Sequence, residues 1–177
     1  MKILTFGFGT TPIFLKALFE RVRSDAEHVD WLVVLPTSHH KKLMEDEVGV
    51  EKVLCLGTSL SLISIKTDVS CLHGYAGNIF RDIETTKKGL KHKKSNIQER
   101  KAITTYCLLK EFIVANKPDY ILYIQPIEGM DGMILANIAK ELGIPLAVPH
   151  HTRWLGLTFF ASEPQEILPT CSLFTTE

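Results

Sequence analysis

Short apolar runs alternate along this chain with longer segments whose apolar residues recur at helical spacing. The short runs predict strands at about 2–7, 30–36, 51–56, 119–125 and 145–149, with a sixth at 171–176. The segments of helical period predict helices at about 12–22, 96–116 and 129–142. Repeated strand, helix, strand units are typical of a parallel sheet.

The predicted helices each present one apolar face. The first follows Pro12, which suits a first turn, and its inward positions are Phe14, Leu15, Leu18, Phe19 and Val22. The long helix has its inward face at Ala102, Ile103, Tyr106, Leu109 and Ile113. Lys110 falls at the edge of that face, where its stem can pack while its charge reaches water. Gly143 follows the third helix, where left-handed backbone is wanted.

Two of the predicted strands, near 32–35 and 121–124, are apolar on both faces. Such strands lie in sheets that helices cover on both sides. The pattern therefore predicts an α/β fold: a Rossmann-like, doubly wound parallel sheet in three layers. We expect residues 1–177 to form one such domain. In the middle of the chain, residues 60–67 alternate like a short strand and residues 77–88 suggest a helix.

Composition excludes several classes of protein. The chain has 177 residues, with 20 basic and 20 acidic side chains, and 45% of its residues are hydrophobic. This balance excludes a disordered tail and an overall polybasic nucleic-acid binder. No apolar run approaches the roughly 20 residues that cross a bilayer, and residues 1–7 read as a strand, so we expect a cytoplasmic protein. The four cysteines form no CxxC pair, so we expect buried thiols and no metal site.

One segment departs from the even charge balance. Residues 87–101 carry seven basic side chains and one acidic one, Glu99. Because no aromatic residues are interleaved, a surface loop is a better interpretation than an RNA-binding patch. A cationic loop over a cleft could still hold an anionic acceptor or a peripheral membrane surface.

Open parallel sheets bind ligands outside the carboxyl ends of their strands, which selects three loops here. The first contains Gly7, Gly9, Thr10 and Thr11 and enters a helix, whose amino end offers N–H groups to an anion or a hydroxyl. It could instead be a glycine turn that only packs strand on helix. NAD binding is not expected, because Pro12 replaces the third glycine of the dinucleotide fingerprint.

The second and third loops carry the side chains that could do chemistry. Glu128 and Asp131 flank the start of the third helix, where they could complement its dipole, bind sugar hydroxyls or act as a base. His150, His151 and Arg153 follow the fifth strand. Neighbouring histidines at a strand end point to opposite sides and cannot easily share a metal, but one imidazole suits proton transfer or anion binding. A hydrogen-bonded loop histidine is the alternative.

A longer pattern runs through the last two loops. It comprises Lys117-Pro118-Asp119, an apolar strand to Ile124, Glu128-Gly129, Gly132, Ala136, the run from Ala139 to Pro145, and His150-His151. This pattern resembles the amino-terminal half of two-domain GT-B glycosyltransferases, especially surface and capsule polysaccharide enzymes and the related UDP-N-acetylglucosamine 2-epimerases. Thr152 replaces the family's glycine after the histidine, and the epimerases' Glu-Ala-Gly-Leu-Arg run is absent. The resemblance therefore favours a transferase.

The resemblance implies a role for each loop. In GT-B enzymes the donor nucleotide is held mainly in a carboxyl-terminal domain, so this chain would be the acceptor-side half, completed by a second domain or a partner chain. It would help to move a sugar from a nucleotide-sugar to a saccharide or lipid-linked acceptor. His151 or Glu128 would be the general base, the backbone of Gly7 to Thr11 would lie near the acceptor, and Arg153 would hold anionic groups. No metal or other cofactor is expected.

A rival interpretation uses the same three loops. The sequence Gly9-Thr10-Thr11-Pro12 also resembles nucleotide-sensing domains of bacterial defence proteins. On that interpretation the chain is a stand-alone Rossmann-like module that senses a small anionic nucleotide.

Overall fold

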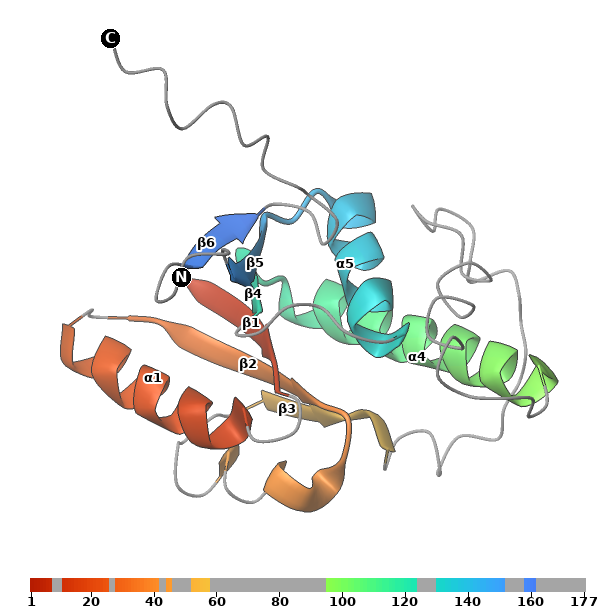
Figure 1. Ribbon diagram of the computed structural model, residues 1–177, viewed down its shortest axis with the longest axis horizontal. Helices are drawn as coiled ribbons and strands as arrows, with labels where there is room; N and C mark the ends of the chain where they lie inside the picture. Colours follow the sequence, from red (N-terminus) through yellow and green to blue (C-terminus); the bar gives the residue numbers. More distant parts are fainter. Residues whose placement is uncertain are drawn as a thin grey trace, which may run out of the picture.

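A computed structural model of the chain describes residues 1–7, 11–25, 28–41, 44–45, 52–57, 95–123, 130–151 and 158–161. These residues form a sheet with the strand order β3-β2-β1-β4-β5-β6 (Figure 1). The strands are β1 (Lys2–Phe6), β2 (Asp30–Leu35), β3 (Lys52–Cys55), β4 (Tyr120–Tyr123), β5 (Leu146–His151) and β6 (Thr158–Ala161). The helices are α1 (Thr11–Asp25), the short 3-10 turn η1 (Ser38–His40), α4 (Ser95–Asn116) and α5 (Met130–Leu142).

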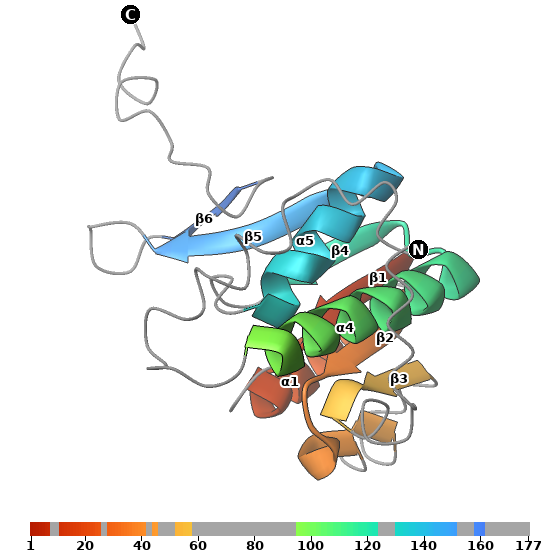
Figure 2. The ribbon, with the colours of Figure 1, turned by 90° about the vertical axis from the view of Figure 1, so that its right-hand side faces the viewer.

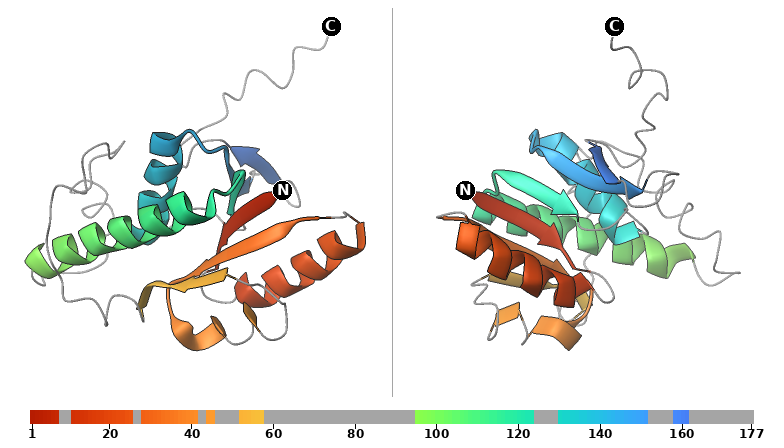
Figure 3. Two further views of the ribbon diagram at one scale, coloured as in Figure 1. Left: turned by 180° about the vertical axis from the view of Figure 1, so that it is seen from behind. Right: turned by 60° about the vertical axis from the view of Figure 1, so that its left-hand side comes forward.

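The first five strands are parallel to their neighbours, and β6 joins β5 antiparallel at the edge. Figure 2 shows α4 and α5 lying across the sheet, and the left view of Figure 3 shows α1 on the opposite side. The chain therefore adopts the expected α/β, Rossmann-like fold with a doubly wound parallel sheet.

Two apolar cores hold the layers together, one on each face of the sheet. The larger lies under α4 and α5, and its residues include the five positions predicted for the inward face of α4. The smaller lies under α1, where Leu15 and Phe19 pack on Val33 and Leu35 of β2 and on Cys55 of β3. Burial of this apolar surface is the main favourable contribution to folding. Of the cysteines in the described residues, Cys55 is buried, as expected, and Cys107 is half-buried.

The inward face of α1 is narrower than the periodicity suggested. Leu15 and Phe19 are fully buried, but Phe14 is 57% exposed, so its predicted place in the core is wrong. The helix rests on β2 and β3 along a single stripe, and Phe14 lies beside that stripe.

The last two strands of the sheet, β5 and β6, differ from the prediction. Strand β5 continues through His150 and His151, which the sequence placed in a loop, because both residues pair with β6. The edge strand β6 was not predicted. The predicted strand at 171–176, the alternating run at 60–67 and the helix at 77–88 lie outside the described residues.

Two helices end on residues with left-handed backbone. Gly143 has φ 65° after α5, and the Ile144 N–H donates to the Ala139 carbonyl at 2.9 Å, which confirms the predicted cap. Lys117 has φ 48° after α4, and its N–H donates to the Ile113 carbonyl at 2.8 Å. A glycine takes this conformation without strain, whereas a lysine does so at a cost.

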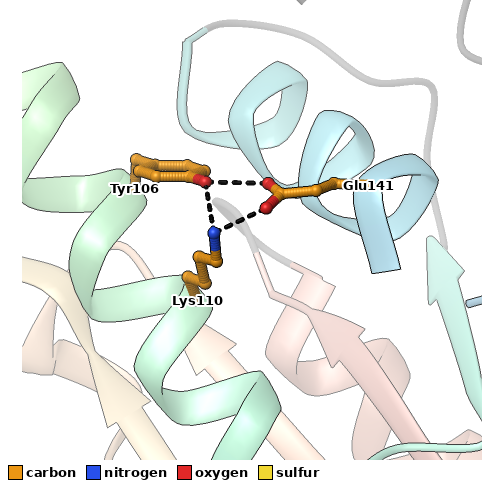
Figure 4. A network of polar contacts seen from close by, with 3 residues as sticks. All are labelled: Tyr106, Lys110 and Glu141. Carbon is orange, nitrogen blue, oxygen red and sulfur yellow. Dashed lines mark hydrogen bonds and ion pairs between the residues drawn. The ribbon is translucent and has the colours of Figure 1, made fainter. Parts of the chain in front are cut away.

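A polar network joins α4 to α5 (Figure 4). The Tyr106 hydroxyl donates to Glu141 Oε2 at 2.7 Å and accepts from Lys110 Nζ at 2.9 Å, while Lys110 Nζ also pairs with Glu141 Oε1 at 2.5 Å. The Lys110 side chain is 28% exposed, so it reaches water as predicted, and its charge also meets the Glu141 carboxylate. The hydrogen bonds that Lys110 donates to Glu141 and Tyr106 raise the pKa of Lys110, so its ammonium stays charged in neutral solution.

Candidate functional site

The candidate site lies where the sheet reverses its direction of winding. Strand β1 pairs with β2 on one side and with β4 on the other, and Phe6 stands in register with Tyr123. Helix α1 leaves the carboxyl end of β1 toward one face of the sheet, whereas α5 follows β4 on the other face. In doubly wound folds, ligands bind in the crevice that opens at this point.

The first loop is described only at its two ends. Gly7 is buried, and its N–H donates to the Val34 carbonyl at 2.9 Å, so this amide is committed to the sheet and is not offered to a ligand. Thr11 is the first residue of α1. Gly9 and Thr10 lie outside the described residues.

Asp131 is the site residue whose surroundings are best defined. It lies in the first turn of α5, and its Oδ1 is buried with no hydrogen-bond partner among the described residues. Burial raises the pKa of the Asp131 carboxyl, and the positive charge of Lys101 on α4 opposes that effect. A carboxylate held out of water with an unused oxygen is costly, and such groups occur where a ligand supplies the missing partner.

Tyr123 contributes to the same corner, although sequence reasoning had assigned it only to an apolar strand. It is the last residue of β4 and is 2% exposed, and its ring lies 6.0 Å from that of Phe6. Its hydroxyl donates to the Gly132 carbonyl at 2.7 Å. One indication of this role was available from the sequence: a tyrosine in a buried strand usually has a hydrogen-bond partner for its hydroxyl.

The third predicted loop is partly a strand. The backbones of His150 and His151 pair with Phe159 and Thr158 of β6, so both histidines lie at the carboxyl end of β5. Strand β5 is the next strand after β4, so the exits of β1, β4 and β5 share one edge of the sheet as predicted. Glu128 and Arg153 lie outside the described residues.

Two features are absent from the described residues. No group of three or more histidine, cysteine, aspartate or glutamate side chains in them could hold a metal ion. No helix in them is long and apolar enough to cross a membrane.

Comparisons with known proteins concern the fold. No protein-family model matches the chain, and no curated protein matches it. Among solved structures, the UDP-GlcNAc 2-epimerase from Neisseria meningitidis bound to UDP-GlcNAc is similar with a TM-score of 0.48 and 14% identity, over 84% of this chain and 32% of that one. A second UDP-N-acetylglucosamine 2-epimerase has a TM-score of 0.44 and 14% identity, with the same coverage of 84% and 32%. This chain thus spans about a third of the length of either structure.

Proposed function

We propose that this chain is the acceptor-side domain of a glycosyltransferase that moves a sugar from a nucleotide-sugar to a saccharide or lipid-linked acceptor. A second domain or a partner chain would complete the enzyme and hold most of the donor nucleotide. The observation that carries the proposal is the buried, unpartnered Oδ1 of Asp131 beside the reversal point of the sheet. The sequence pattern from Lys117 to His151 supports it independently.

The charge of Asp131 decides which ligand chemistry suits this corner. The amino end of a helix ordinarily attracts phosphate, because its N–H groups and its dipole favour negative charge. A carboxylate in the first turn of α5 repels a phosphate but accepts hydrogen bonds from hydroxyl groups. The α5 corner therefore suits a neutral, hydroxyl-bearing acceptor better than a diphosphate.

The proposed reaction divides the work among the residues at this edge. An acceptor hydroxyl oxygen attacks the anomeric carbon of the donor sugar, the bond from that carbon to the nucleotide diphosphate breaks, and the diphosphate leaves with the bonding electrons. His151 or Glu128 takes the hydroxyl proton as general base, and Asp131 orients the acceptor through its carboxylate. In this proposal the backbone near Gly9 and Thr10 contacts the acceptor, and Arg153 and His150 bind anionic groups.

A panel of ligands tests this function against its rival. Thermal unfolding of the chain is followed with oligosaccharides, with UDP-, GDP- and CMP-linked sugars, and with cyclic mononucleotides. A ligand at about 100 times its dissociation constant stabilises the folded state by about 2.7 kcal/mol, which raises the melting temperature by several degrees. The proposal expects this response from saccharides or nucleotide-sugars. A response confined to cyclic nucleotides would replace the transferase with the nucleotide-sensing module, and no response to any sugar would refute the proposal.

A further inference from the structure

The buried hydroxyl of Tyr123 forms a bond between β4 and the first turn of α5. Tyr123 ends the described part of β4, and Gly132 lies next to Asp131 in α5. The distance from the Tyr123 oxygen to the Gly132 carbonyl oxygen is 2.7 Å, and the bond is buried. A carbonyl oxygen has two lone pairs, so Gly132 can accept this bond as well as the one inside its helix. The contact is an addition to the helix rather than a substitute for one of its bonds.

This bond holds the turn that carries Asp131. The first residues of a helix lack part of their backbone hydrogen bonding and fray most readily, so the first turn of α5 needs outside support. Asp131 would gain hydration if the turn loosened, because its carboxyl is costly to bury. The apolar core under α5 and the hydrogen bond from the Tyr123 hydroxyl both oppose this loosening, and the hydrogen bond acts on the residue next to Asp131.

We propose that Tyr123 is a positioning residue for Asp131: its hydroxyl fixes the first turn of α5 on the carboxyl end of β4 and so keeps the Asp131 carboxyl buried and aimed at the ligand. The inference rests on the proposed role of Asp131 as the hydroxyl acceptor. Tyr123 touches no reacting atom in this scheme. Its ring remains packed against Phe6 whether or not the hydroxyl is present.

The test measures the Asp131 carboxyl itself, so it does not depend on sugar transfer. The pKa of Asp131 is followed by carbon-detected NMR across a pH titration of the full chain, with Asp131→Asn used to assign the signal. Tyr123→Phe removes one oxygen and keeps the ring. It should let the turn loosen and hydrate the carboxyl, so the pKa of Asp131 should fall toward its ordinary value of 3.8. An unchanged or higher value would overturn the proposal.

Tyr106→Phe is the matched control. It removes another hydroxyl of a buried tyrosine, one that joins α4 to Glu141 near the opposite end of α5. This variant should lower stability without moving the Asp131 titration. If both variants move it equally, the effect is general loosening and Tyr123 has no special role. If the wild-type chain binds no saccharide, the proposed function is refuted. The effect of Tyr123→Phe on the pKa of Asp131 would still test the positioning role of Tyr123.

A second measurement on the wild type covers the case in which Tyr123→Phe fails to fold. A buried hydroxyl held by Gly132 should give a slowly exchanging proton signal whose chemical shift follows the titration of Asp131. A rapidly exchanging hydroxyl, or one that ignores this titration, would contradict the proposal.

Discussion

Phe6 and Tyr123 stand side by side on neighbouring parallel strands, with ring centroids 6.0 Å apart, at the carboxyl ends of β1 and β4. After Phe6 the chain continues to α1, and after Tyr123 it continues to α5 on the other face of the sheet. The two rings therefore mark the place where the fold reverses its winding. The proposed function depends on this place and on the carboxylate beside it.

Asp131→Asn should stabilise the folded chain at neutral pH. Because burial raises the pKa of this carboxyl, the folded state binds its proton more tightly than the unfolded state does. The resulting stability is complete below the ordinary pKa of 3.8 and is lost as pH rises through the folded pKa. At pH 7 the buried charge destabilises the folded state, so the free energy of unfolding of the variant should be higher by on the order of 1 kcal/mol. Replacing a polar functional residue often stabilises a protein in this way.

Urea denaturation near pH 7 and near pH 3 checks this sign. The gain should be present at pH 7 and absent at pH 3, where the native carboxyl is itself neutral. Asp30→Asn is the control, because Asp30 is exposed at the start of β2 and its replacement should change the free energy of unfolding by less than about 0.5 kcal/mol. A variant that is less stable than wild type at pH 7 would count against a costly buried charge.

Lys110→Met should destabilise the contact between α4 and α5. It leaves the Glu141 carboxylate, whose side chain is 13% exposed, with the Tyr106 hydroxyl as its one remaining side-chain partner in the described part of the chain. Breaking a partly buried pair of this kind costs about 1–3 kcal/mol, between the values for exposed and fully buried pairs. Replacing the exposed Lys52 with Met should cost much less.

The contribution of Lys110 should also depend on alkaline pH. The raised pKa of a lysine gives stability that is complete below its ordinary value of 10.5 and is lost as pH rises toward the folded pKa. Burial likewise raises the pKa of Tyr106 above 10.0, so its neutral form contributes stability that fades over the same range. Urea denaturation measures the difference in free energy of unfolding between wild type and Lys110→Met. This difference should be the same near pH 7 and pH 9 and smaller near pH 11. A difference that widens in alkali would contradict this assignment of charge.

Gly143 and Lys117 both have left-handed backbone at a helix end, so adding a side chain at one and removing it at the other should change stability in opposite directions. Gly143→Ala should lower the free energy of unfolding by about 1 kcal/mol, since φ 65° strains any residue with a Cβ atom. Lys117→Gly should raise it by a few tenths of a kcal/mol, because relief of the same strain at φ 48° exceeds the entropy that glycine adds to the unfolded chain. Chemical denaturation measures the free energy of unfolding of both variants. If both substitutions change it in the same direction, backbone strain at these helix ends is not the deciding effect.

His151 is predicted to be the proton acceptor in any assembly of this chain that transfers a sugar. Loss of a general base typically costs about 100-fold or more in turnover, so His151→Ala should lower kcat by at least that factor. The neighbouring His150→Ala is the matched control and should raise KM more than it lowers kcat, in keeping with a binding role. Near-normal turnover in His151→Ala would move the role of base to Glu128.

Sequence patterning predicted the parallel strands because β2 and β4 are apolar on both faces, and the covering helices because their apolar residues recur at helical period. It missed β6, since a run of four residues carries no periodicity that separates a strand from a loop. It also misplaced Phe14, because spacing along a helix does not reveal how wide a stripe its partner sheet covers. Asp131 was visible as a candidate, but its burial and its connection to Tyr123 depend on tertiary packing.

The affinity of Asp131→Asn for a sugar ligand tests the central claim most directly. The saccharide or nucleotide-sugar that stabilises wild type most in the ligand panel is titrated by calorimetry into wild type, Asp131→Asn and the Asp30→Asn control. A hydrogen bond to a charged group contributes about 1.5–3 kcal/mol, so Asp131→Asn should bind about 10- to 100-fold more weakly while Asp30→Asn binds as wild type does. Equal affinity in all three proteins would contradict the account, because the buried carboxylate would then have no part in recognising a sugar.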